Sequence, residues 1–142
     1  MKKIIVTGHG HYATGLQSAV ELFAGKNDDV FYVDFVQEDS DETLKGKLER
    51  MIETHQDSEI LIFCDLIGGT PYKVAAELAF HDDRLEVVAG CNVGALLDAI
   101  FTKEQQGIAS LAEHVVEVSK QATGAFVKKL ETPTEDLPED GI

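Results

Sequence analysis

Short runs of β-branched and aliphatic residues alternate with segments of helical periodicity along most of this chain. The apolar runs predict strands over residues 3–7, 30–35, 59–65 and 85–89. The segments between them place apolar residues three or four positions apart, as an amphipathic helix does. This alternation is typical of parallel strands joined by right-handed helical crossovers. We therefore predict an α/β fold of three layers, doubly wound, with helices on both faces of a mostly parallel sheet.

The helix boundaries carry recognisable end signals. Gly25 ends the first predicted helix, and residues 39–42 resemble a capping box before the second. Thr70 is the predicted N-cap of the third helix, with Pro71 at the first helical position. We expect a fourth helix over 93–101 and a longer last helix over most of 108–130, with Gly124 as a break.

The length and charge of the chain limit the classes of function. A chain of 142 residues forms one domain with a substantial core, and a net charge of −14 argues against binding to nucleic acid. No apolar run approaches the roughly 20 residues of a membrane-spanning helix. We expect a cytoplasmic protein in which Cys64 and Cys91 stay reduced. Residues 1–130 are the predicted domain, and residues 131–142, with five acidic side chains, a flexible tail.

Polar and glycine residues follow each predicted strand. In an open α/β sheet the binding site lies beyond the carboxyl ends of the strands. The segments found there are Gly8-His9-Gly10-His11, then Asp34-Phe35, then Asp65 to Tyr72, and last Gly90-Cys91-Asn92. If the first and third strands are neighbours, His9 and Asp65 face each other across the sheet edge.

The pairing of His9 with Asp65 suggests nucleophilic chemistry. An imidazole is a competent nucleophile when an acceptor holds one ring nitrogen protonated and the other lone pair is free. Gly68 and Gly69 allow backbone N–H groups to approach an anion, and Thr70 adds a hydroxyl at a helix N-terminus. These features predict that His9 is phosphorylated transiently, without a metal ion or a cofactor.

Simpler interpretations apply to each feature alone, because glycines also serve tight turns and Gly-Gly-Thr-Pro also describes an ordinary helix start. A metal site of His9, His11 and Asp65 is a weaker alternative, since the remaining histidines fall on predicted helices or a helix end. No nucleotide-binding glycine motif is present. The candidate pocket residues around the site are Thr7, Gly10, His11, Tyr72 and Asn92.

Three segments of the chain resemble one protein family. These are residues 4–10 followed by Leu16, residues 65–72, and residues 88–93. In this order and spacing they resemble the mannose-type (mannose/fructose/sorbose) enzyme IIA component of the bacterial phosphoenolpyruvate:sugar phosphotransferase system. The resemblance covers roughly residues 2–130.

The resemblance implies a fold, a pathway and partners. His9 would accept phosphate from the carrier HPr and pass it to a IIB component, whose membrane permease is the only link to the membrane. Asp65 would contact the active histidine. The strand order would be 2-1-3-4, with a short antiparallel edge strand near the C-terminal end exchanged within a homodimer.

The chain departs from this pattern at two positions. Gly8 stands before His9 where many members have Ser or Thr, so Thr7 or Thr70 would supply a hydroxyl. His11 stands where some relatives have an aromatic or small residue. No IIB domain follows residue 130, so we expect a stand-alone IIA protein.

Three other functions remain open. One is the phosphocarrier domain of a dihydroxyacetone kinase system, although residues 68–71 favour the sugar-transport branch. The others are a non-enzymatic regulatory binding module and a metal-dependent hydrolase.

Overall fold

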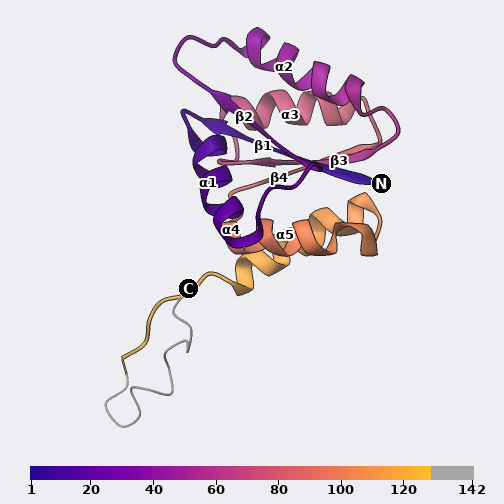
Figure 1. Cartoon of the computed structure of the whole chain (residues 1–142). Helices are drawn as coiled ribbons and strands as arrows, with labels where there is room; N and C mark the ends of the chain where they lie inside the picture. Colours follow the sequence, from indigo (N-terminus) through magenta and orange to yellow (C-terminus); the bar gives the residue numbers. More distant parts are fainter. Residues whose placement is uncertain (129–142) are drawn as a thin grey trace.

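A computed structural model of the chain describes residues 1–128 and contains one four-stranded sheet (Figure 1). Its strands are β1 (Lys2–His9), β2 (Val30–Phe35), β3 (Glu59–Cys64) and β4 (Leu85–Ala89). They pair in the order β2-β1-β3-β4, and every pair is parallel. The predicted fold class and strand order are confirmed.

Helices cover both faces of the sheet, as Figure 1 shows. On one face lie α2 (Asp41–Thr54) and α3 (Thr70–Phe80); on the other lie α1 (Tyr12–Ala24), α4 (Val93–Thr102) and α5 (Ile108–Gln121). A single 3-10 turn, η1 (Lys103–Gln105), joins α4 to α5. Alternate residues of β1 point to opposite faces, so Ile4 and Val6 pack with α1, α4 and α5, whereas Ile5 packs with α2 and α3.

The register of β1 sets the position of the predicted site. This strand is buried over most of its length and continues to His9, two residues beyond the predicted end. Its last residues pair Gly8 with Asp34 and His9 with Phe35 of β2. The N–H of Gly10 then donates to the carbonyl of Phe35 at 2.7 Å. His9 therefore leaves the sheet at its carboxyl edge, next to the ends of both neighbouring strands.

The N-termini of two helices differ from the prediction. The N-cap of α2 is Ser40, whose hydroxyl accepts from the N–H of Thr43, while Asp39 accepts from the N–H of Val36 and closes the preceding turn. The N-cap of α3 is Gly69, one residue before Thr70. In both segments several consecutive residues suit a cap, and the tertiary position of the loop decides among them.

The last helix is shorter than predicted. It ends at Gln121, before Gly124, and Asn92 contacts this end: the amide of Asn92 donates to the carbonyl of Ser119 at 3.1 Å and to the hydroxyl of Thr123 at 3.0 Å. Residues 129–130 and the predicted tail, 131–142, lie outside the described residues. The exchanged edge strand stays a prediction.

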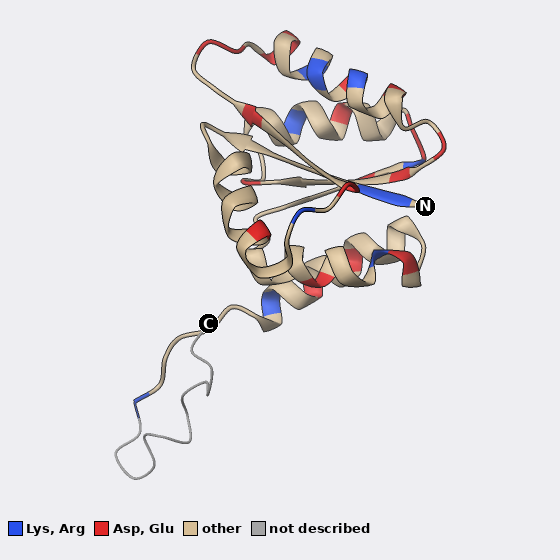
Figure 2. Cartoon of the chain, viewed as in Figure 1, with Lys and Arg blue, Asp and Glu red and all other residues tan. Residues whose placement is uncertain are grey.

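Charged residues lie mainly at the surface of the part of the chain that the structure describes. Figure 2 shows Lys, Arg, Asp and Glu mainly on the helices, loops and strand ends, with the middle of the sheet free of them. None of the helices within residues 1–128 has both the length and the apolar character needed to cross a bilayer. Cys64 and Cys91 are both free thiols, as predicted.

Candidate functional site

His9 and Asp65 meet at the carboxyl ends of β1 and β3. The Nδ1 atom of His9 lies 2.7 Å from Oδ2 of Asp65, and the same oxygen accepts the backbone N–H of His9 at 2.9 Å. Because a carboxylate only accepts, the proton of this contact belongs to Nδ1. The second ring nitrogen, Nε2, is left with its lone pair. The imidazole side chain is 46% exposed and the carboxylate 10%, so a buried acceptor holds an accessible ring.

The carboxylate of Asp65 is held in its ionised form. Partial burial raises its pKa, but hydrogen bonds from the backbone and ring of His9 and from the N–H of Leu66 outweigh that effect and leave the pKa lowered. The Leu66 N–H donates to Oδ1 at 2.8 Å. Both oxygens of Asp65 are therefore occupied by donors, which fixes the carboxylate beside Nδ1 of the His9 ring.

Two glycines let the backbone pack closely around this pair. A Cβ atom on Gly8 would lie 2.5 Å from Cδ1 of Tyr12 and 2.9 Å from Cβ of Asp65. A Cβ atom on Gly69 would lie 2.7 Å from Cε1 of His9 and 3.4 Å from its Nε2. The close approach of Tyr12 thus explains why position 8 is a glycine. The backbone of Gly69 lies against the Cε1–Nε2 edge of the His9 ring.

The loop from β3 brings a helix N-terminus to the same edge of the ring. Gly68 has a φ of +86°, a conformation that other residues rarely adopt, and Gly69 follows as the N-cap of α3. Thr70 begins the helix and Pro71 lies in its first turn. The first N–H groups of a helix have no partner within it, and they carry the positive end of its dipole. Within the predicted segment 68–70, Gly69 is the residue whose backbone lies next to the His9 ring.

The remaining predicted pocket residues lie in different surroundings. Thr7 is fully buried in β1, and its hydroxyl has no hydrogen-bond partner among the described residues. Tyr72 packs against the core on the α2 and α3 face. Asn92 is the N-cap of α4, with its side chain bonded to Ala95, Ser119 and Thr123. Gly10, with a φ of +58°, forms the turn between His9 and His11.

His11 contacts a different carboxylate from His9. Its Nδ1 lies 3.0 Å from Oδ2 of Asp34 on β2, and its side chain is 81% exposed. Asp34 is itself fixed by Thr14, which donates its N–H at 3.0 Å and its hydroxyl at 2.7 Å. Partial burial raises the pKa of Asp34, but these hydrogen bonds outweigh it and leave the pKa lowered.

Two residues of the site were absent from the predicted set. Phe35 lies edge-on to the His9 ring with centroids 6.0 Å apart, and Asp34 holds His11. Both stand at the carboxyl end of β2, and that position is the signal from which they were predictable. In residues 1–128, no three His, Cys, Asp or Glu side chains converge as a metal centre requires.

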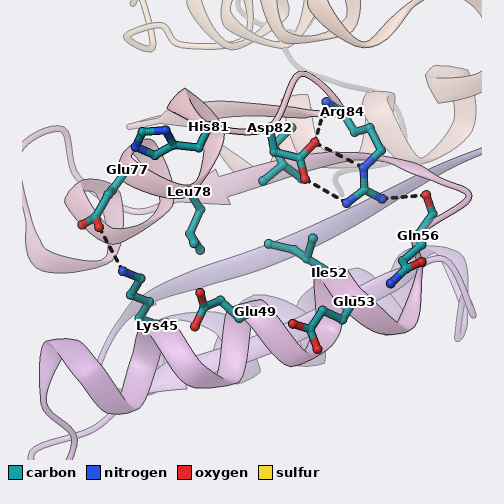
Figure 3. A pocket seen from close by; sticks show the side chains of 11 residues that line it. Lys45, Glu49, Ile52, Glu53, Gln56, Glu77, Leu78, His81, Asp82 and Arg84 are labelled. Carbon is teal, nitrogen blue, oxygen red and sulfur yellow. Dashed lines mark hydrogen bonds and ion pairs between the residues drawn. The ribbon is translucent and has the colours of Figure 1, made fainter.

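A separate pocket of 560 Å³ lies between α2 and α3 and contains none of these residues (Figure 3). Two of the basic side chains that line it, Lys45 and Arg84, are paired with neighbouring groups. Lys45 contacts Glu77 at 3.0 Å, and Arg84 contacts Asp82 at 2.8 Å and the carbonyl of Gln56 at 2.8 Å. This pocket shares no lining residue with the site around His9.

Known proteins are similar to this chain in sequence and in fold. A family model described as PTS system fructose IIA component matches residues 3–116. The fructose-specific EIIA component of Bacillus subtilis is 26% identical over 146 residues, with all of both chains covered. The sorbose-specific EIIA component of Lacticaseibacillus casei is 28% identical, covering 92% of this chain and 94% of that protein.

Two solved structures of similar proteins superpose on most of the chain. Phosphotransferase system component EIIA from Streptococcus agalactiae has a TM-score of 0.82 and 29% identity over 89% of this chain and 98% of its own. The mannose/sorbose-specific IIA subunit from Enterococcus faecalis has a TM-score of 0.83 and 26% identity over 92% and 99%. The residues that the family model matches make up most of the sequence and include both His9 and Asp65. The chain therefore belongs to the PTS system fructose IIA component family, which serves phosphoryl transfer in sugar uptake.

Proposed function

We propose that this protein is a phosphoryl carrier that accepts a phosphoryl group on Nε2 of His9 from phosphorylated HPr and transfers it to a IIB component. The observation that carries the proposal is the 2.7 Å contact between His9 Nδ1 and Asp65, which leaves Nε2 as the free nucleophile. Membership of the family supports the direction of the relay and a cytoplasmic location.

The transfer is balanced without a metal ion or an external base. The Nε2 lone pair of His9 attacks phosphorus while the bond from phosphorus to the donor's ring nitrogen breaks, and that nitrogen keeps the electron pair. His9 retains the proton on Nδ1, so its phosphorylated ring carries one positive charge. Asp65, already ionised and 2.7 Å from Nδ1, compensates that charge. Attack on the same phosphorus by the acceptor group of the IIB component breaks the bond to Nε2, which keeps the electron pair, and His9 returns to its starting state.

Backbone donors supply the second part of the proposed mechanism. A phosphoryl group on Nε2 would lie beside Gly69 and the first turn of α3, because the backbone of Gly69 borders that edge of the ring. Free N–H groups at a helix N-terminus stabilise phosphate oxygens. We assign Gly68, Gly69 and Thr70 to this role, with Asp65 orienting the ring.

The test is phosphorylation in a reconstituted relay. Incubation with phosphoenolpyruvate, enzyme I and HPr is expected to add one acid-labile phosphoryl group per chain, detected by intact mass. Adding the cognate IIB protein is expected to remove it. The proposal is overturned if the protein gains phosphate neither from phosphorylated HPr nor from the small-molecule donor phosphoramidate.

Homodimer formation is a further part of the proposal. The outer edge of β4 pairs with no strand among residues 1–128, and such an edge accepts another strand readily. A strand near the C-terminal end of a second copy would fill it, as the family resemblance suggests. A monomeric mass in solution at micromolar concentration contradicts this part alone.

Gly69→Ala is expected to slow phosphorylation of His9 by roughly 100-fold, because the added Cβ would lie 2.7 Å from Cε1 and displace the ring from its in-line position. Gly69 has φ −75° and ψ 168°, which alanine adopts without strain, so the effect is steric. The rate with phosphoramidate measures it. Unfolding free energy should change by less than about 1 kcal/mol.

Gly15→Ala is the matched control for this variant. A Cβ at Gly15, inside α1, meets no atom within 4 Å. We expect an unchanged phosphorylation rate and a gain of about 0.5–1 kcal/mol in stability. Equal rates for both variants would show that the contact between Gly69 and His9 does not limit the reaction.

Ile67→Ser is expected to weaken docking of the protein donor without affecting the chemistry. Leu66 and Ile67 follow Asp65 directly and are 59% and 76% exposed, an unusual position for large apolar side chains. KM for phosphorylated HPr should rise roughly fivefold, since loss of an apolar contact at an interface costs on the order of 1 kcal/mol. The rate with phosphoramidate should stay unchanged.

Leu22→Ser is the control for Ile67→Ser, because it also replaces an exposed apolar side chain with serine. Leu22 is 88% exposed near the C-terminal end of α1, away from the strand ends that hold His9. KM for phosphorylated HPr should not change in this variant. If both serine variants raise KM equally, surface apolarity in general is responsible and the assignment of Ile67 to the docking surface is wrong.

A further inference from the structure

Thr7 carries a buried hydroxyl that has no hydrogen-bond partner. The residue is fully buried in β1, and its Oγ1 is the one buried side-chain polar atom within residues 1–128 that is left unpaired. A buried hydroxyl without a partner keeps the full penalty of its lost hydration. Valine would fill nearly the same space without that penalty, and it suits a strand at least as well. The hydroxyl therefore destabilises the unphosphorylated protein that the structure describes.

The side chains of Thr7 and His9 lie on the same face of the sheet. Side chains alternate between the two faces along a strand, and Ile5 of β1 packs with α2 and α3. Thr7 and His9, two and four residues further on, therefore point toward the same two helices. Thr7 is paired in register with Val33 of β2 and Cys64 of β3, and both belong to the core on this face. Thr7 thus lies one step below His9, between apolar neighbours.

His9 is the polar neighbour of this hydroxyl within the sheet. Of the four nearest side chains on this face, two are hydrocarbons and one is the Cys64 thiol, which accepts hydrogen bonds only weakly. The fourth is His9, whose Nδ1 is committed to Asp65 at 2.7 Å. A phosphoryl group would bring three strong acceptor oxygens to Nε2 of this ring. Successive residues on one face of a strand are about 6.6 Å apart, a separation that a phosphorylated imidazole side chain can span.

We propose that the Thr7 hydroxyl is a ligand of the phosphoryl group: it donates to a phosphoryl oxygen on Nε2 of His9 and is unpaired only while His9 is unphosphorylated. The proposal rests on the phosphoryl-carrier function, and it adds a side chain of β1 to the backbone donors of residues 68–70. Because Oγ1 is closed to water in the described state, the bond requires the His9 ring, whose side chain is 46% exposed, to move toward the sheet. The hydroxyl then favours phosphorylation twice, by destabilising the free form and by stabilising the phosphorylated form.

The experiment measures the equilibrium of phosphoryl exchange with HPr for two substitutions of Thr7. Thr7→Val removes the hydroxyl and keeps the shape, whereas Thr7→Ser keeps the hydroxyl and removes a methyl group. The equilibrium constant for transfer from phosphorylated HPr, determined from intact masses, should fall about tenfold or more in Thr7→Val and stay within about threefold of the wild type in Thr7→Ser. The thermal midpoints of the unphosphorylated proteins should follow the opposite order, with Thr7→Val at or above the wild type and Thr7→Ser below it.

The inference is wrong if Thr7→Val exchanges phosphate at the wild-type equilibrium, or if both variants lower the equilibrium constant equally, since packing would then be responsible. It is also wrong if Thr7→Val is less stable than Thr7→Ser before phosphorylation, because the hydroxyl would then serve the fold. A second measurement needs no variant. Phosphorylation of the wild type should shift the NMR signal of the Thr7 hydroxyl proton and slow its exchange with water, and an unchanged signal overturns the inference. A wild-type protein that neither phosphorylated HPr nor phosphoramidate phosphorylates contradicts the carrier function itself, which is a separate result.

Discussion

His9→Gln is expected to abolish phosphorylation by either donor, the largest effect of any single substitution in this protein. Glutamine offers no ring nitrogen with a free lone pair, so no bond to phosphorus forms. Because the His9 side chain is 46% exposed, its replacement removes little packing, and the thermal midpoint should stay near the wild-type value. Intact mass after incubation with phosphoenolpyruvate, enzyme I and HPr measures the result.

His11→Gln is the matched control, since the two histidines share a loop and each has Nδ1 on a strand-end carboxylate. This variant should still gain one phosphoryl group. The opposite pattern, with phosphate on His9→Gln and none on His11→Gln, would move the acceptor to His11. Backbone geometry favours His9, because the N-cap of α3 lies against its ring.

The architecture was predictable because strand burial and helical periodicity are properties of local sequence. The run 60–64 is apolar at every position, which indicates a strand covered on both faces, and β3 is that strand. The strand order came from the family resemblance, since pairing of β1 with β3 joins residues more than fifty positions apart. The end of α5 was not predictable from local signals, because the contacts of Asn92 with Ser119 and Thr123 form only in the folded chain.

The site was predictable in its main pair and less so in its details. His9 and Asp65 both follow apolar strands, so a parallel sheet with β1 beside β3 brings them together. The requirement for glycine at position 69 depends on the distance to the His9 ring, which no pattern of residues reveals. The partnership of His11 with Asp34 was missed although both positions were visible as strand ends, because the rotamer of an exposed histidine is set by tertiary contacts.

Asp65→Asn is expected to slow phosphorylation of His9 by about 10²- to 10⁴-fold, the loss found when a carboxylate that orients a histidine becomes an amide. Oδ2 of Asp65 accepts two donors from His9, and Oδ1 accepts the N–H of Leu66. Asparagine has one carbonyl oxygen, so its NH₂ group must face an N–H in either orientation. The positive charge of the phosphorylated ring also loses its counter-charge. Single-turnover rates with phosphoramidate measure the effect.

Asp34→Asn, which alters the equivalent contact of His11, should leave the phosphoramidate rate within about twofold of the wild type.

The pH dependence gives a second check on Asp65. Because the pKa of Asp65 is lowered in the folded protein, its carboxylate is ionised at any pH above the ordinary aspartate pKa of about 3.9. Its contact with the protonated Nδ1 of His9 is lost only as pH falls through the lower pKa of the folded state. Asp65 in the wild type should therefore stay ionised between about pH 5 and pH 8, which the chemical shift of its carboxyl carbon measures. An Asp65 carboxyl resonance that titrates within this range would contradict its role as a fixed counter-charge.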